Sequence, residues 1–408
     1  MESPTTDLNV AALTEKTSNE VEVGEADDMR TWTVPHSADT SYLTHSYFRY
    51  IGKFAPQIAS KIIEDHYPGE GPVLDPMVGG GTVLTEAVLR GIPCEGWDVN
   101  PVSRLISRTV SKKVNQEDLL EVGNEILRGL EIINGEKGLF SDEINGWERE
   151  GIDIDHCDEY FDEQTKTEIE FALHIIKKEE DNREEISETM MTIVLDTLRK
   201  ISKANVKKMN VEIDESKTNK KTLLEAFKKR FDKIQEINSS LPGIFSEGLS
   251  KVREQNAMDW DTEDWETDSK YGLICIHPPY LTNTAFSEAT ELQLALMGIN
   301  HKDIWKEELR YRGSYLRETN GVRKYLVNWS KIIRSASDSL LENGKLALVV
   351  GDGQISYQRI PIGAISEEFA KDADLELTCK AFHVLNNNTG QTQTKRMKGE
   401  HVLIFEKS

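Results

Sequence analysis

A run of three glycines between an apolar stretch and a helical pattern constrains the fold of this chain most strongly. Residues 72–75 predict a short buried strand that leads into the glycines at 79–81. A helical pattern follows over 82–90, and Gly91 is a typical helix stop. Residues 94–98 then predict a second strand. This strand–loop–helix–strand order predicts a doubly wound α/β sheet, with the glycines where such a sheet binds its cofactor.

The glycine loop favours close approach of the backbone to a ligand, because glycine has no side chain to keep the ligand away. The loop lacks the Gly-Lys-Ser/Thr ending of a phosphate-binding loop and the GxGxxG spacing of a dinucleotide binder. Asp75, at the end of the first strand, is placed to accept from an ammonium group. Asp98, at the end of the second, is placed to accept from both hydroxyls of a ribose. The alternative for Asp98 is a helix cap ahead of Pro101.

A third candidate position follows a predicted strand over 252–256. Asn256 is placed to face the amino group of an adenine, and Asp259 and Asp261 are nearby alternatives.

The second informative motif is His277-Pro278-Pro279-Tyr280, which follows an apolar run over 272–276. The two prolines fix two φ angles and make the turn rigid. Such a turn can hold an amine in line with a reactive group. His277 and the Pro278 carbonyl are candidate acceptors for that amine, and Tyr280 is a candidate stacking partner for a base rotated out of its helix. The alternative is a proline turn that only caps a buried strand.

The rest of the chain divides by composition into four segments. Residues 1–30 are polar and acidic, and we expect a disordered tail. Residues 31–114 and 251–408 carry the strand patterns, and 115–250 predicts a helical insertion rich in Glu and Lys. Within that insertion, residues 199–233 hold 12 Lys or Arg against 5 Asp or Glu. This stretch is either a basic binding surface or a solvated helix face.

Composition limits the classes of protein that this chain can be. The net charge of −22 argues against a surface that attracts nucleic acid everywhere, although it allows a local basic groove. Neither a membrane-spanning run nor a secretory signal is expected, so we expect a cytoplasmic protein. The four cysteines lie far apart without a CxxC pattern, so no metal site is expected, and Cys275 is expected to be a buried apolar residue.

Taken together, these motifs resemble those of the amino-group DNA methyltransferases, which make N4-methylcytosine or N6-methyladenine. The family pattern Asp-Pro-Phe-x-Gly-x-Gly-Thr stands at 75–82 with Met77 for Phe, and the pattern Asp/Asn/Ser-Pro-Pro-Tyr stands at 277–280 with His277 in first place. The similarity extends to 53–56, to 281–283, and to the C-terminal patterns at 349–352 and 401–405.

The resemblance implies a Rossmann-like, seven-stranded methyltransferase sheet with a helical insertion. It implies S-adenosylmethionine as cofactor and double-stranded DNA, with its target base flipped out, as substrate. The cofactor would be bound by Asp75, Pro76, Gly79, Gly81, Thr82, Asp98 and Asn256. The catalytic motif would be His277, Pro278, Pro279 and Tyr280. A restriction endonuclease is a partner that such enzymes often have.

The substitution at His277 keeps several alternatives open, because a neutral imidazole accepts a hydrogen bond and a protonated one does not. The aromatic stretch over 44–56 and the helical insertion favour cytosine N4 over adenine N6. An RNA base-amino methyltransferase and a non-catalytic DNA-binding relative are the other hypotheses. The basic stretch 199–233, the Arg/Tyr segment 309–317 and the loop 386–398 are candidates for the DNA-facing surface.

Overall fold

The computed structural model describes most of the chain. The described residues are 10–26, 29–53, 55–135, 157–206, 208, 210–217, 221–260, 270–281, 285–309, 319–355, 358–384 and 399–407. Phe54, residues 282–283, most of the 309–317 segment and the loop 386–398, which the sequence had singled out, lie outside the described residues.

A mixed, mostly parallel sheet forms the centre of the fold, with strand order β1-β2-β10-β11-β7-β6-β3-β4-β5. Its strands are β1 (Glu22–Ala26), β2 (Met29–Thr33), β3 (Val73–Asp75), β4 (Cys94–Asp98), β5 (Ser250–Glu254), β6 (Tyr271–Ile276), β7 (Leu340–Val350), β10 (Leu375–Val384) and β11 (Gly399–Lys407). A separate hairpin joins β8 (Gly353–Ile355) to β9 (Gln358–Ile360). Strands β5, β4, β3, β6 and β7 run parallel, and β11 is antiparallel to both β7 and β10.

The helices alternate with these strands over most of the chain. They are α1 (Val10–Asn19), α2 (Pro56–His66), α3 (Thr82–Leu89), α4 (Pro101–Val110), α5 (Gln116–Ile133), α6 (Glu163–Glu179), α7 (Glu184–Ile201), α8 (Leu223–Ser240), α9 (Phe286–Ala289), α10 (Glu291–Leu296), α11 (His301–Glu307), α12 (Thr319–Asp338) and α13 (Ile362–Lys371). The expected α/β class with a doubly wound sheet is confirmed.

Two predictions about the edge of the sheet are wrong. The seven strands from β5 to β10 match the expected number, but β1 and β2 extend the sheet to nine, with β2 parallel to β10. The expectation of a disordered tail over 1–30 fails for residues 10–26, which form α1 and β1. Tertiary contacts outweigh the polar composition there, since Trp32 is only 1% exposed and the hydroxyls of Thr17 and Ser60 lie 2.9 Å apart.

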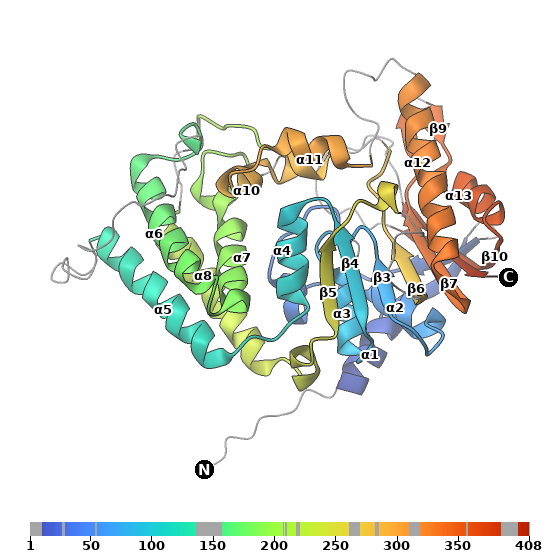
Figure 1. Cartoon of the computed structure of the whole chain (residues 1–408), viewed down its shortest axis with the longest axis horizontal. Helices are drawn as coiled ribbons and strands as arrows, with labels where there is room; N and C mark the ends of the chain where they lie inside the picture. Colours follow the sequence, from blue (N-terminus) through green and yellow to red (C-terminus); the bar gives the residue numbers. More distant parts are fainter. Residues whose placement is uncertain are drawn as a thin grey trace, which may run out of the picture.

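Helices cover both faces of the sheet because side chains alternate along its strands. On β6, Leu273 and Cys275 join the core beneath α1, α2 and α3, whereas Ile274 and Ile276 join the core beneath α12 and α13. The helices α5 to α8 form a further block with its own apolar core, which α4 connects to the sheet (Figure 1). Strands β3 and β4 end at Asp75 and Asp98, and β6 ends one residue before His277.

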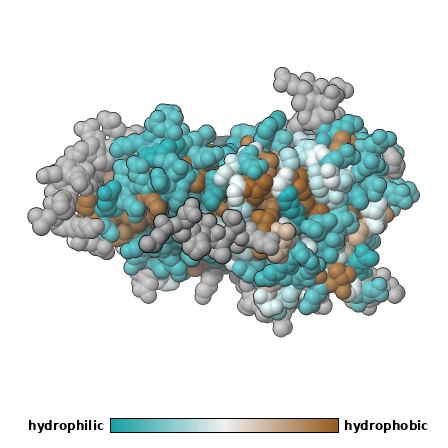
Figure 2. Space-filling view, turned by 90° about the horizontal axis from the view of Figure 1, so that it is seen from below, coloured by the Kyte–Doolittle hydropathy of each residue, from teal (hydrophilic) through white to brown (hydrophobic). Residues whose placement is uncertain are grey.

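The surface agrees with the acidic, polar composition. The described surface in Figure 2 is mostly hydrophilic, with apolar residues gathered in the half that carries the sheet in Figure 1. Among the described helices, none has the length and apolarity needed to cross a bilayer. All four cysteines are buried and free, and the described residues contain no group of three or more His, Cys, Asp or Glu side chains arranged to hold a metal ion.

Candidate active site

The glycine loop joins β3 to α3 in a conformation that requires glycine at two positions. Gly79 and Gly81 have φ values of +47° and +77°, in the left-handed region that side chains disfavour. A Cβ at Gly81 would also lie 2.6 Å from Cγ2 of Val110. The backbone N–H of Gly79 donates to Oδ2 of Asp98 at 3.0 Å, so the loop is tied to the end of β4.

Two carboxylates flank this loop, as the sequence predicted. Asp75 is 3% exposed, and its Oδ1 accepts from the N–H of Met77 at 3.1 Å. Burial raises the pKa of Asp75 to about 7, and the nearby charge of Asp98 acts in the same direction. Burial also raises the pKa of Asp98, although bonds from the N–H groups of Asn100 and Gly79 lower it in part. Both groups are therefore suited to a cationic or hydrogen-bond-donating ligand.

The alternative interpretation of Asp98 as a helix cap is wrong. Oδ1 of Asn100 accepts from the N–H of Val102 at 3.0 Å and caps α4. Asp98 instead accepts from the N–H of Asn100 at 2.8 Å. Its Oδ2 accepts from the N–H of Gly79, so Asp98 holds the glycine loop in place and does not cap α4.

The second motif follows β6, which delivers it to the same end of the sheet. Nε2 of His277 lies 2.8 Å from the Tyr280 hydroxyl, and the two rings meet edge to face with centroids 5.4 Å apart. The carbonyl of Pro279 accepts from the Tyr325 hydroxyl at 2.9 Å. The turn is thus held by Tyr325 of α12 as well as by its prolines.

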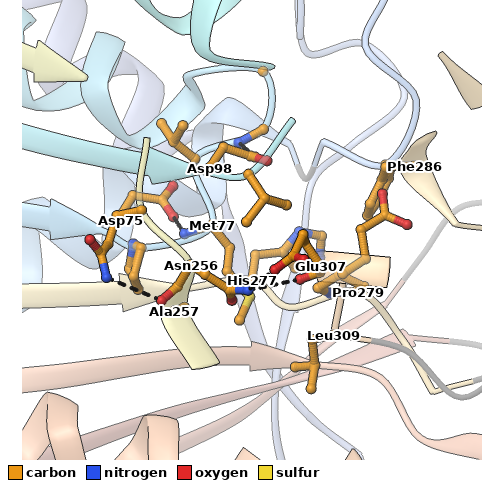
Figure 3. A pocket seen from close by; sticks show the side chains of 18 of the residues that line it. Asp75, Met77, Asp98, Asn256, Ala257, His277, Pro279, Phe286, Glu307 and Leu309 are labelled. Atoms are coloured by element: carbon orange, nitrogen blue, oxygen red, sulfur yellow. Dashed lines mark hydrogen bonds between the residues drawn. The ribbon is translucent and has the colours of Figure 1, made fainter. Parts of the chain in front are cut away.

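A single pocket, which we call the acidic pocket, brings the two motifs together (Figure 3). It encloses about 770 Å³ with its open mouth included. In Figure 3, Asp75 and Phe286 lie at opposite sides of the pocket, with His277 between them. Eight of the predicted site residues line it: Asp75, Pro76, Gly79, Thr82, Asp98, Asn256, His277 and Pro279.

The other three predicted residues, Gly81, Pro278 and Tyr280, lie beside the lining and not in it. Asn256 lines the pocket with its amide already engaged. Its Oδ1 accepts from the N–H of Met258 at 3.0 Å, and its Nδ2 donates to the side chain and carbonyl of Glu307 at 3.2 Å. The amide is therefore fixed in orientation at the pocket wall.

The charge of the pocket is mainly negative. Besides Asp75 and Asp98, its lining contains Glu307 and Glu308, against the single cation Lys53 among the described lining residues. Burial lowers the pKa of Lys53 to about 8, and its ammonium donates to the carbonyl of His45 at 2.5 Å. The sequence did not single out Phe286, Glu307 or Glu308, because Phe286 and Glu307 belong to short helices, Glu308 follows one, and no motif surrounds them.

A second cavity, which we call the basic groove, adjoins the acidic pocket. It encloses about 1,190 Å³ including its mouth. Tyr50 and Phe286 line both cavities, and their rings stack with centroids 5.8 Å apart at 25°. The groove is lined by Phe48, Arg49, Tyr50, Ile51, Asp196, Arg199, Lys200, Val206, Lys208, Phe286, Ala289, Thr290 and Gln293.

One buried carboxylate, Asp196, lies in the lining of the basic groove and pairs with one of its cations, Lys200. Oδ1 of Asp196 accepts from the backbone N–H of Arg49, and its Oδ2 accepts from the ammonium of Lys200, both at 2.9 Å. The guanidinium of Arg199 donates to the carbonyls of Ala289 at 2.7 Å and Lys208 at 2.9 Å. Part of the basic stretch 199–233 therefore forms one wall of the groove.

Comparisons with known proteins agree with the motifs. The chain is 27% identical over 171 residues to the Type II methyltransferase M.MvaI of Kocuria varians. This match covers 41% of this chain and 36% of that protein. It is 24% identical over 309 residues to the Type II methyltransferase M.BsoBI of Geobacillus stearothermophilus. That match covers 71% of this chain and 59% of that protein. The matches thus span less than two thirds of each relative's own length.

The remaining comparisons are with family models and with solved structures. No family model matches the chain. Among solved structures, the rRNA methyltransferase aviRa from Streptomyces viridochromogenes aligns with 91% of this chain and 94% of its own, at 11% identity and a TM-score of 0.32. The sequence matches to Type II methyltransferases confirm the resemblance stated from the motifs.

Proposed function

Starting from this similarity to Type II methyltransferases, we propose that the protein transfers a methyl group from S-adenosylmethionine to the exocyclic amino group of a base in DNA. We further propose cytosine N4 as the acceptor in preference to adenine N6, because the aromatic stretch over 44–56 and the helical insertion favour it. One observation supports the proposal above all others: the glycine loop and the His277 motif line the same pocket.

The residues of the acidic pocket fit S-adenosylmethionine. That cofactor carries a sulfonium, an ammonium and two ribose hydroxyls, which suit a pocket lined by carboxylates. The hydroxyl of Thr82 is buried at the pocket and has no hydrogen-bond partner among the described residues, so it is available to a polar ligand. When bound, the cofactor supplies an electrophilic methyl group.

Each protein group has a separate task in the proposed binding mode. Asp75 faces the ammonium, and Asp98 uses its remaining lone pairs for the ribose hydroxyls. Pro76, Gly79 and Gly81 shape the loop, and Asn256 faces the adenine from its fixed orientation.

The amine of the base is a poor nucleophile, because its lone pair is delocalised into the ring. Acceptance of its hydrogens by His277 and by the Pro278 carbonyl would localise that lone pair on nitrogen. The Pro279 carbonyl already accepts from Tyr325, so the preceding carbonyl is the better candidate. Tyr280 flanks the base, and the rigid turn holds the amine in line with the methyl group.

The basic groove supports a polyanionic substrate. Its lining carries Arg49, Arg199, Lys200 and Lys208 in a chain whose net charge is −22. Because only the contacting face must neutralise phosphates, this groove is where we place the DNA strand that carries the flipped base. In this proposal the helical insertion over 115–250 supplies one wall of the substrate site.

A labelled-methyl assay tests the proposal. Purified protein is incubated with labelled S-adenosylmethionine and either genomic DNA or transfer RNA, beside a His277→Ala variant. We expect label in DNA with the parent and a strong loss with the variant. Label in transfer RNA alone, or no transfer to either polymer by a protein that binds the cofactor, would contradict the proposal.

A further inference from the structure

A buried carboxylate lies behind the His277 motif, outside the lining of the acidic pocket. Glu400 is 4% exposed on β11, where it pairs in register with His383 on β10. Its Oε2 lies 2.9 Å from Nδ1 of His383. Its Oε1 accepts from the Tyr280 hydroxyl and lies 3.6 Å from Nε2 of His277. Two imidazoles and a phenol thus converge on one carboxylate.

The protonation states of this cluster follow from its surroundings. Burial and the charge of Glu400 raise the pKa of Tyr280 well above its ordinary value, so the phenol keeps its proton. Burial opposes ionisation of Glu400, but its interactions with His277 and His383 outweigh burial and hold the pKa of Glu400 below its usual range. An ionised carboxylate only accepts, so Tyr280 donates to Glu400.

The direction of the hydrogen bond between Tyr280 and Glu400 sets the direction of the hydrogen bond between His277 and Tyr280. A phenol whose proton points to Glu400 presents its oxygen lone pairs to His277. Nε2 of His277, 2.8 Å from that oxygen, is therefore the protonated nitrogen. In a neutral imidazole with a proton on Nε2, Nδ1 is an acceptor. The opposite tautomer would turn Nδ1 into a donor, which repels an amine hydrogen.

We infer that Glu400 is a positioning residue for His277, acting through Tyr280 to hold the imidazole in the tautomer whose Nδ1 accepts from the substrate amine. The inference rests on the proposed function, since it concerns how the same motif receives an amine. It also accounts for the departure from the family pattern. A serine or aspartate in first place has no tautomer to fix, whereas a histidine needs a second group to fix it.

The test compares Glu400→Gln in two backgrounds, the parent and a His277→Ser variant. In the parent, we expect kcat to fall about tenfold or more, with little change in KM for DNA or cofactor, because the hydrogen bond to a charged group is removed. In the His277→Ser background, the serine hydroxyl can rotate to donate or to accept a hydrogen bond. Glu400→Gln should therefore change kcat by less than about threefold. Equal losses in both backgrounds would show a merely structural role and overturn the inference.

Two further measurements keep the test decisive if His277→Ser has little activity. Tyr280→Phe removes the connecting hydroxyl and should lower kcat as much as Glu400→Gln, with no further loss in the double variant. Additive losses would overturn the inference.

The tautomer itself is read by NMR of the imidazole nitrogens, which needs no activity. We expect a protonated Nε2 at His277 in the parent and a mixed or reversed tautomer in Glu400→Gln. An unchanged tautomer would also overturn the inference. A parent that shows the expected tautomer but transfers no methyl group would refute the proposed function and leave the positioning of His277 by Glu400 standing.

Discussion

The acidic pocket and the basic groove share a wall, yet they carry opposite charge. Tyr50 and Phe286 line both. The acidic pocket has four carboxylate residues against Lys53, and the basic groove has four cationic residues against Asp196. A protein with a net charge of −22 therefore keeps a mainly cationic groove next to an acidic pocket. The comparison shows that net charge does not describe a binding surface, because the charge of each cavity is set locally. It agrees with the proposed placement of the cofactor in the acidic pocket and of DNA in the basic groove.

The largest expected effect is on cofactor affinity, and it distinguishes the proposed roles of the two cavities. Asp98→Asn should weaken S-adenosylmethionine binding about tenfold to a hundredfold, because each hydrogen bond to a charged group contributes about 1.5–3 kcal/mol. DNA affinity should stay the same, since Asp98 lines only the acidic pocket. Titration calorimetry measures both affinities. Asp372→Asn, which changes an exposed carboxylate outside both linings, is the matched control. Unchanged cofactor affinity in Asp98→Asn would refute the assignment.

The next effect concerns pH and also belongs to the acidic pocket alone. Burial raises the pKa of Asp75 to about 7, so the carboxyl is mostly protonated at pH 6 and mostly ionised at pH 8. A cationic ligand binds the ionised form, and cofactor affinity should therefore rise about tenfold between these pH values. Asp75→Asn should remove that rise. A pH dependence that survives in Asp75→Asn would show that another group is responsible.

A smaller effect is expected on the other side of the shared wall. The double variant Lys200→Gln, Lys208→Gln should weaken DNA binding severalfold and lower the slope of log affinity against log salt by about 0.9 for each phosphate that is no longer neutralised. Cofactor affinity should not change. The matched control neutralises Lys251 and Lys371, which are exposed and outside both linings. Fluorescence anisotropy at several salt concentrations gives the slope, and equal slopes for the two double variants would contradict the role of the groove.

The smallest effect tests the wall itself. The Tyr50 hydroxyl lies 2.9 Å from that of Ser103, and the ring of Tyr50 separates the two cavities. Tyr50→Phe keeps the ring, so both affinities should stay near those of the parent, while the free energy of unfolding falls by about 1 kcal/mol. Urea denaturation gives that free energy. A large loss of either affinity would mean that the hydroxyl, and not the ring, contacts a ligand.

The sequence predicted the half of the site that depends on local pattern. Apolar runs ending in Asp75 and Asp98 gave two adjacent parallel strands, and the carboxyl ends of such strands meet. The run before His277 gave a third strand, β6, on the other side of β3. These predictions succeed because strand pattern and turn residues are encoded within a few positions of one another.

The remaining features depend on contacts between distant segments. Glu400 meets the His277 motif only because β11 pairs with β7 and β10 in a fixed register, and no local pattern encodes that register. The basic groove likewise joins the aromatic stretch over 44–56, at Arg49, to α7 through Asp196. The N-terminal helix and hairpin were missed for the same reason, since the burial of Trp32 against the sheet orders a segment of polar composition.

Nucleoside analysis of genomic DNA from cells that express the protein, beside cells that lack it, tests the central claim most directly. The DNA is digested to nucleosides and the methylated bases are separated by mass spectrometry, with cellular RNA treated in parallel. The account predicts N4-methylcytosine in DNA only when the protein is present, and loss of that mark with Asp98→Asn. N6-methyladenine in its place would correct the base assignment, whereas a new mark confined to RNA, or no new mark in either polymer, would contradict the claim.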